Sequence, residues 1–285
     1  MIVRWGLDSL AGVLEELSIE RPLLITTARW ADVDVPVRQR FDGVQPHAER
    51  AGVEAAVAAA EGADGLVALG GGSAIDTTKA VSARLELPMV SVPTTYSGAE
   101  WTGGFGMRDA QARRKAGGAG AHLAGIVYEP ELTLGLPAGE SGGTALNALA
   151  HCAEALYAPG RGDESDAHAL EGAALIARWL EPVLDDGSDR EARRKLLEGA
   201  MHAGAALRAG MGVGHAMAQA LGGRYGLAHG TMNAVCLPPA LRFNREVAAG
   251  ALARLGEAMA APEPIARVEQ LAVRGGAQPL REFGV

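Results

Sequence analysis

The sequence has only two cysteines, Cys152 and Cys236, among its 285 residues. A disulfide-stabilised secreted scaffold needs a larger, closely spaced set, so two distant cysteines argue against that class. Arg4 and Asp8 also interrupt the first residues, where a signal peptide needs an unbroken apolar core. We therefore expect a cytoplasmic protein whose cysteines are reduced.

Aromatic residues are scarce, and long apolar runs and an excess of positive charge are missing. No run of about 18 uncharged apolar residues occurs, so no membrane span is expected. The formal net charge is −8, which does not suggest a nucleic-acid partner or an anionic membrane surface. Aromatic residues make up 4% of the chain while alanine and glycine abound, and this composition favours closely packed helices over a β-sandwich.

The first half of the chain alternates short apolar runs with helix-forming segments. Strands are predicted over residues 22–26, 65–69 and 88–92, and helices over 53–61 and 73–85. Strands that alternate with helices at this spacing predict βαβ units and a parallel sheet.

The second half reads as helical. Helices are predicted over residues 147–157, 167–184, 190–208, 215–221 and 247–259. We therefore expect an α/β, Rossmann-like parallel-sheet domain over residues 1–137 and an all-α domain over residues 138–285. A cleft between two such domains is the default place for a small-molecule ligand.

The clearest local motif is ALGGGSAIDTTKA, residues 68–80. Gly70, Gly71 and Gly72 end a predicted strand and Ser73 opens a helix, with Asp76 spaced as in a capping box. Glycines let backbone N–H groups approach a phosphate, and a helix N-terminus adds partial positive charge. Taken alone, however, such a turn is equally compatible with an ordinary tight strand–helix connection.

The next predicted strand ends in VPTTYSGAE, which places Thr94, Thr95 and Tyr96 at its exit. Ligands of open α/β sheets bind at the carboxyl ends of the strands. Two polar, glycine-bearing exits from successive strands therefore favour a dinucleotide site over a plain turn.

These two motifs, together with LNALAHCAEALYA and GHAMAQALGGRYGLAHG, resemble the iron-containing alcohol dehydrogenase superfamily, whose members share a dehydroquinate-synthase-like fold. Within it, the segments are most similar to the maleylacetate reductases. The resemblance covers nearly the whole chain and implies a homodimer that transfers hydride from NAD(P)H to a small anionic keto acid in the interdomain cleft. Family members typically continue with further helices beyond the final GGAQPLREFGV.

The resemblance also assigns residues to the cofactor. Gly70–Ser73 match the pyrophosphate loop, and Thr94 and Thr95 match the second cofactor-contacting segment. Lys115 lies near a lysine that often lines the cofactor pocket. Thr26 lies where the dehydrogenase branch has a ribose-binding aspartate, and the missing carboxylate leaves NADH and NADPH both open.

Iron-type members bind a divalent metal through one aspartate and three histidines. The matching positions here are Asn147, His151, His215 and His229, and the first two share a helix face because they are four residues apart. An amide in place of the carboxylate weakens the binding of a divalent ion, although three imidazoles can hold zinc. A bound zinc or iron ion at these four positions is therefore possible but less favoured than a metal-free site. The histidines could also have purely structural roles.

Gln219 is the main departure from the family's reductases, which usually have a histidine there for proton transfer. Glutamine can donate a hydrogen bond but cannot act as a general acid. His151, His215, His229 and Tyr96 are the remaining candidates for catalysis, with Gln219 as an orienting group. The main hypothesis is an NAD(P)H-dependent reductase. The alternatives are a repurposed lyase, dehydratase or cyclase without net redox chemistry, and an inactive scaffold.

Overall fold

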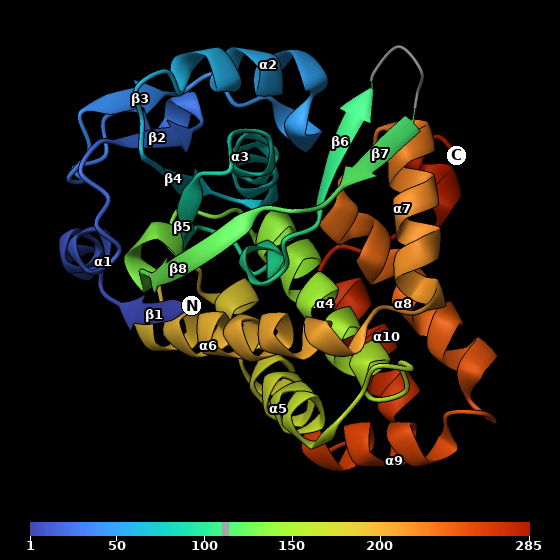
Figure 1. Cartoon of the computed structure of the whole chain (residues 1–285). Helices are drawn as coiled ribbons and strands as arrows, with labels where there is room; N and C mark the ends of the chain where they lie inside the picture. The colour runs from blue at the N-terminus through green and yellow to red at the C-terminus, as the bar shows by residue number, and fades with distance from the viewer. Residues whose placement is uncertain (110–113) are drawn as a thin grey trace. The chain divides into compact units, whose positions relative to one another are not determined.

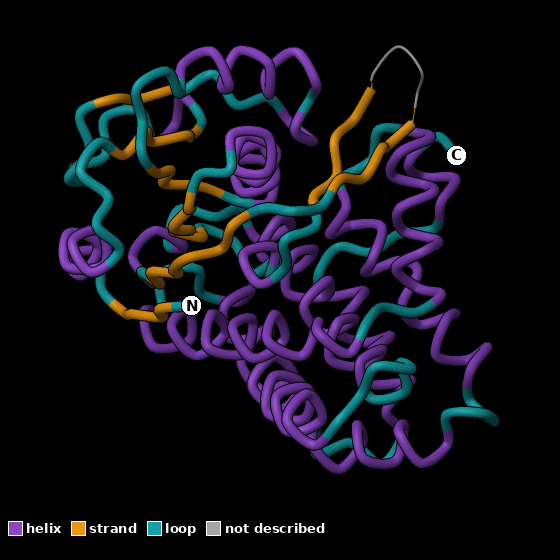
Figure 2. The backbone as a smooth tube through the Cα atoms, viewed as in Figure 1, coloured by secondary structure: helices purple, strands orange, loops and turns teal. Residues whose placement is uncertain are grey.

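The computed structural model describes residues 1–109 and 114–285, and these form two compact units (Figure 1). Unit 1 comprises residues 1–94 and 99–132, and unit 2 comprises residues 95–98 and 133–285. Within the described residues, all strands belong to unit 1, whereas unit 2 consists of helices and loops (Figure 2). The expected combination of an α/β part and a helical part is confirmed.

Unit 1 is built on a six-stranded sheet whose neighbouring strands all pair in parallel. Its spatial order is β1 (Ile2–Trp5), β8 (His122–Tyr128), β5 (Pro88–Pro93), β4 (Gly65–Gly70), β2 (Pro22–Thr26) and β3 (Gln39–Phe41). The three predicted strands are confirmed as β2, β4 and β5. β1, β3 and β8 were not predicted. β1 and β3 are short and carry polar residues, so neither has an apolar run of its own.

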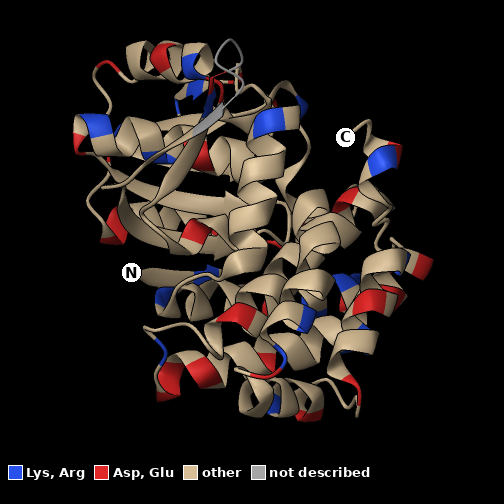
Figure 3. Cartoon of the chain, turned by 90° about the vertical axis from the view of Figure 1, so that its right-hand side faces the viewer, with Lys and Arg blue, Asp and Glu red and all other residues tan. Residues whose placement is uncertain are grey.

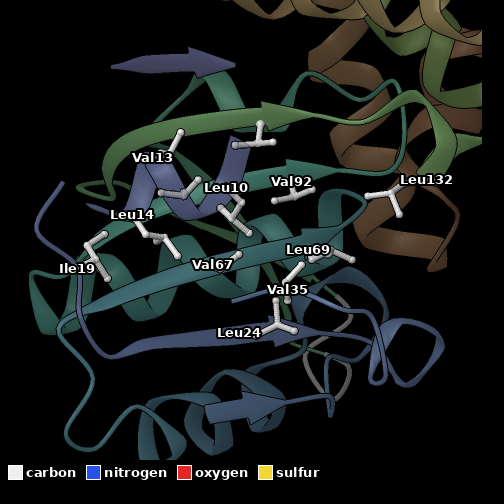
Figure 4. Close-up of a cluster of buried hydrophobic side chains, with 12 residues drawn as sticks. Leu10, Val13, Leu14, Ile19, Leu24, Val35, Val67, Leu69, Val92 and Leu132 are labelled. Carbon is white, nitrogen blue, oxygen red and sulfur yellow. The ribbon is translucent and has the colours of Figure 1, made fainter. Parts of the chain in front are cut away.

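Helices cover both faces of this sheet, namely α1 (Leu10–Glu16), α2 (Arg50–Ala59) and α3 (Gly72–Leu85). Side chains alternate between the two faces of a strand. Leu24 and Val67 therefore pack with Leu10 of α1 on one face (Figure 4). Leu23 and Leu66 pack on the other face with residues of α2 and α3. β6 (Phe105–Asp109) and β7 (Arg114–Gly118) form a separate antiparallel pair.

Unit 2 contains seven α-helices. They are α4 (Ala138–Ala155), α5 (Asp163–Asp185), α6 (Arg190–Ala206), α7 (Val213–Tyr225), α8 (His229–Asn244), α9 (Ala249–Ala258) and α10 (Pro264–Arg274). The five predicted helices are confirmed. α8 and α10 were not predicted. α8 has Pro238 and Pro239 inside it, and an interior proline normally breaks a helix. The burial of Leu237 and Leu241 on the same helix shows that tertiary packing outweighs this penalty.

α4 begins nine residues earlier than predicted, because glycines at its start weaken the helical signal. Those glycines have a packing role. A Cβ on Gly142 would collide with the backbone of Gly275, and one on Gly143 would lie 3.2 Å from the backbone nitrogen of Thr231. The small residues therefore let α4 approach α8 and the end of α10 closely.

Figure 3 shows Lys and Arg interspersed with Asp and Glu along the ribbon. No helix in the described residues is long and apolar enough to cross a membrane. Both cysteines are buried and unpaired. Burial raises the pKa of the Cys152 thiol, and it raises that of Cys236 to about 11, so neither is a ready nucleophile.

Candidate active site

The predicted cofactor residues of unit 1 meet at one edge of the sheet. Gly70 pairs with Pro93 at the carboxyl ends of β4 and β5, and the Thr94 N–H donates to the Gly70 carbonyl at 3.0 Å. The Thr26 hydroxyl at the end of β2 donates to the Leu69 carbonyl at 2.7 Å. Three adjacent strand exits therefore lie at the edge where open α/β sheets bind ligands.

The glycine turn at this edge fits a phosphate. Gly70 has φ of +148°, a conformation that side chains rarely adopt, and a Cβ there would lie 2.8 Å from the Cβ of Ala74. Gly71 then caps α3, which begins at Gly72. The first N–H groups of an α-helix have no intrahelical acceptor and carry the positive end of its dipole. The loop thus has the backbone shape and charge to hold a dinucleotide pyrophosphate.

Two predicted details of this region are wrong, and one lies outside what the structure describes. Ser73 lies within the first turn of α3, and its Oγ accepts the His47 N–H at 2.9 Å. Asp76 accepts the Gly106 N–H at 3.1 Å, so the two do not form the expected capping box. Lys115 lies on β7, but its side chain is not among the described residues.

Unit 2 brings together the three histidines that match the family's metal positions. His151 comes from α4, His215 from α7 and His229 from α8. The His151 and His215 rings stack with centroids 4.3 Å apart, and the His215 and His229 centroids are 6.1 Å apart. His151 and His215 are nearly inaccessible, with 5% and 2% of their surfaces exposed. Helix packing therefore makes one cluster from residues that are up to 78 positions apart in the sequence.

A chain of hydrogen bonds fixes two of these rings. The Asn147 Nδ2 lies 2.8 Å from the Ser97 carbonyl and 3.0 Å from His151 Nε2. Because a carbonyl only accepts, the Asn147 amide nitrogen must face it, and its Oδ1 then accepts from Asn233 Nδ2 at 2.6 Å. The same Asn233 nitrogen lies 3.0 Å from His229 Nε2. His151 and His229 both accept at Nε2, so each neutral ring carries its proton on Nδ1.

Asn233 was not predicted, although it follows His229 by four residues and therefore shares its helix face. The same environment keeps His151 neutral. Burial lowers its pKa well below the ordinary value, and the neighbouring His215 and His229 lower it further.

This donor set does not fit a zinc or iron ion. A metal needs the lone pairs on the imidazole nitrogens, but those on Nε2 of His151 and His229 already receive amide N–H groups. The neutral Asn147 amide supplies no ligand charge, and its oxygen is taken by Asn233. Within the described ranges, no group of three or more His, Cys, Asp or Glu side chains is placed to hold a metal ion. We therefore assign no metal ion to this site.

His215 differs from the other two histidines because a carboxylate holds it. Glu154 is fully buried and accepts from His215 Nδ1 at 2.6 Å and from the Gly212 and Gly214 N–H groups at 2.7 Å each. Burial by itself raises the pKa of Glu154, but the hydrogen bonds and the attraction to His215 outweigh it and hold the pKa below its ordinary value. His215 Nε2 is buried and has no hydrogen-bond partner among the described residues.

Glu154 was also missed from the sequence. It follows His151 by three residues on α4, a spacing that places both side chains on one face and could have identified it. Its ionised carboxylate and the His215 ring, whose Nε2 has no partner among the described residues, form a carboxylate–imidazole pair. Such an arrangement is suited to proton transfer.

The remaining predicted residues are Tyr96, Gln219 and Thr95. Tyr96 is fully buried, and its hydroxyl accepts from Arg193 at 3.1 Å, so this candidate proton donor is anchored in the core of unit 2. Burial raises its pKa. Gln219 is half-buried on α7, one turn after His215. Thr95 begins the short segment of unit 2, and its Oγ1 is buried without a partner among the described residues.

Sequence comparisons identify the family. Residues 6–124 match the iron-containing alcohol dehydrogenases, and residues 142–285 match the C-terminal part of the same family. Maleylacetate reductase of Pseudomonas knackmussii is 35% identical, with 99% of this chain and 85% of that enzyme covered. 4-Hydroxybutyrate dehydrogenase of Cupriavidus necator is 36% identical, with 95% and 84% covered.

A structural comparison agrees. The crystal structure of maleylacetate reductase from a Rhizobium strain superposes with a TM-score of 0.91 at 31% identity, covering 100% of this chain and 85% of that one. Fold and relatives together define the chain as an oxidoreductase. It belongs to the iron-containing alcohol dehydrogenase family. These findings support the reductase expected from the sequence and do not favour the lyase, dehydratase or cyclase alternative.

Proposed function

We propose that the protein is an NAD(P)H-dependent reductase of a small unsaturated dicarboxylic keto acid, the substrate class that maleylacetate represents. One observation carries the proposal. In a chain related to maleylacetate reductases, Nε2 of His215 is buried with no hydrogen-bond partner among the described residues, while Nδ1 of the same ring donates to the Glu154 carboxylate. Nδ1 of His151 is also unpartnered there, and the Nε2 atoms of His151 and His229 accept amide hydrogens. The proposal includes the division into a cofactor domain, residues 1–137, and a substrate domain, residues 138–285, and it includes a homodimer.

The glycine turn of unit 1 would hold the cofactor. Gly70, Gly71 and the first turn of α3 present N–H groups to its pyrophosphate, while Thr26 and Thr94 flank them. When bound, NAD(P)H supplies the hydride.

His215 would act as the general acid. Adding hydride to a carbon–carbon double bond conjugated to a ketone shifts an electron pair onto the ketone oxygen. The resulting enolate needs a proton to give the saturated keto acid, so each turnover takes up one proton from solvent. Protonated His215 presents Nε2–H to the substrate, and the Glu154 carboxylate at Nδ1 balances its charge. Gln219 can hydrogen-bond to the substrate but cannot release a proton, so we assign the acid to His215 and not to residue 219.

The test is the oxidation of NADH and NADPH by the purified protein, followed by nicotinamide absorbance with maleylacetate as substrate. We expect one reduced nicotinamide to be oxidised for each substrate consumed, at a rate unchanged by a metal chelator. Oxidation of 4-hydroxybutyrate with NAD(P)⁺ is assayed in parallel. Substrate loss without nicotinamide oxidation contradicts the proposal.

Two histidine variants test the assigned acid. His215→Asn should lower kcat by about 10²- to 10⁴-fold, the usual contribution of a positioned general acid. His122→Asn is the matched control, because His122 is an exposed side chain of β8 in unit 1. Equal activity in both variants would mean that His215 is not the acid.

A further inference from the structure

The carboxylate of Glu154 lies at the start of α7 and contacts three N–H groups there. Gly212 is the N-cap of α7, and Gly212 and Gly214 supply N–H groups that the helix itself cannot pair. An anion at a helix N-terminus is favoured by the helix dipole. Glu154 therefore caps α7 and in the same place accepts the proton of His215 Nδ1.

The two glycines are needed for this contact. A Cβ on Gly212 would lie 2.8 Å from Glu154 Oε1, and one on Gly214 would lie 2.9 Å from the same atom. Both distances are shorter than side-chain carbon atoms tolerate. The sequence Gly212-Val213-Gly214-His215 is thus a cradle in which backbone and imidazole donors converge on one carboxylate.

We propose that Glu154 is a positioning residue that fixes His215 as the Nδ1–H tautomer and points its Nε2 at the substrate; this rests on the proposed role of His215. An ionised carboxylate only accepts hydrogen bonds, so the ring nitrogen beside it must carry a proton. The stacked His151 ring 4.3 Å away limits rotation of the His215 ring. Nε2 is consequently the ring nitrogen that is left without a hydrogen-bond partner among the described residues.

Glu154→Gln tests this inference, because it keeps the size of the side chain but replaces one acceptor oxygen by a donor amide. In either orientation the amide NH2 faces an N–H donor, that of Gly214 or those of Gly212 and His215, and the negative charge beside His215 Nδ1–H is lost. We expect kcat to fall by about 10²- to 10⁴-fold with KM changed less than threefold, as when a catalytic histidine loses its orienting carboxylate. Asp166→Asn is the control, since Asp166 is another buried carboxylate of unit 2 that contacts arginines.

Gly214→Ala displaces the carboxylate without removing it, and it keeps the inference testable if Glu154→Gln does not fold. Gly250→Ala on α9 is its control, because a Cβ there meets nothing within 4 Å. We expect Gly214→Ala to lower kcat at least tenfold and Gly250→Ala to leave it unchanged. Wild-type kcat in Gly214→Ala would overturn the inference.

The tautomer is measured directly by ¹⁵N NMR of histidine-labelled protein without substrate, with the His215 signal assigned from His215→Asn. The wild type should show protonated Nδ1 and bare Nε2, and Glu154→Gln should lose this pattern. A wild-type His215 protonated at Nε2, or one unaffected by Glu154→Gln, would overturn the inference. If the tautomer is as expected but no keto acid is reduced, the proposed function fails while the role of Glu154 stands.

Discussion

Asn147→Asp tests the hydrogen-bond chain that distinguishes this site from a metal-binding site. Asn147 is only 2% exposed, and its Nδ2 lies within bonding distance of the Ser97 carbonyl and His151 Nε2. Aspartate has no N–H, so both hydrogen bonds are lost, at about 1 kcal/mol each. A carboxylate oxygen then faces the Ser97 carbonyl with no hydrogen between them, and an unpaired buried acceptor costs about 1–3 kcal/mol more. We expect the free energy of unfolding to fall by about 3–5 kcal/mol.

The assay is urea unfolding followed by circular dichroism, with a chelator and then with zinc. In the chelator, Asn147→Asp should show the full loss of stability. Zinc at about 100 times its dissociation constant should restore about 2.7 kcal/mol to the variant, because a carboxylate now joins the three histidines. The wild type should gain nothing from zinc.

The control is Asn244→Asp, a half-buried position at the end of α8, which should cost less than about 1 kcal/mol. If Asn147→Asp is as stable as this control in the chelator, the Asn147 amide does not donate to Ser97 and His151. The reasoning about the tautomers of His151 and His229 would then be wrong.

Three further outcomes are expected. Gln219→His should raise the reductase kcat by about tenfold if the group at 219 limits proton delivery, and an unchanged kcat would show that it does not. Gly70→Ala should weaken NAD(P)H binding at least tenfold in a fluorescence titration, since its φ of +148° disfavours a side chain, whereas Gly12→Ala in open space should not. Burial and then the neighbouring His168 lower the pKa of His202, so the unfolded chain takes up that proton first. Stability is complete above about pH 6.5 and falls below it. A His202→Asn variant should lose less stability than the wild type between about pH 7 and pH 5, and equal losses would contradict this.

Much of the fold could be predicted from local pattern alone. β2, β4 and β5 are apolar runs that end at glycine, threonine or proline, and the main helices carry regular apolar spacing. The failures occurred where local preference and packing disagree. α8 contains two prolines, and the start of α4 contains glycines that neighbouring backbones require. Such conflicts are resolved by tertiary burial, which local pattern does not report.

The sequence by itself determined the residue types, the glycine turn and the spacing that places Asn147 with His151, and the motif resemblance pointed to the family and its three histidines. Only the tertiary structure decided what those histidines do. It set the Ser97 carbonyl against Asn147, set Asn233 between Asn147 and His229, and set Glu154 against the start of α7. The physical reason is that a proton's place on an imidazole depends on its hydrogen-bond partners. Glu154 lies 61 residues from His215, and Asn147 lies 86 residues from Asn233, so no local pattern in the sequence records these contacts.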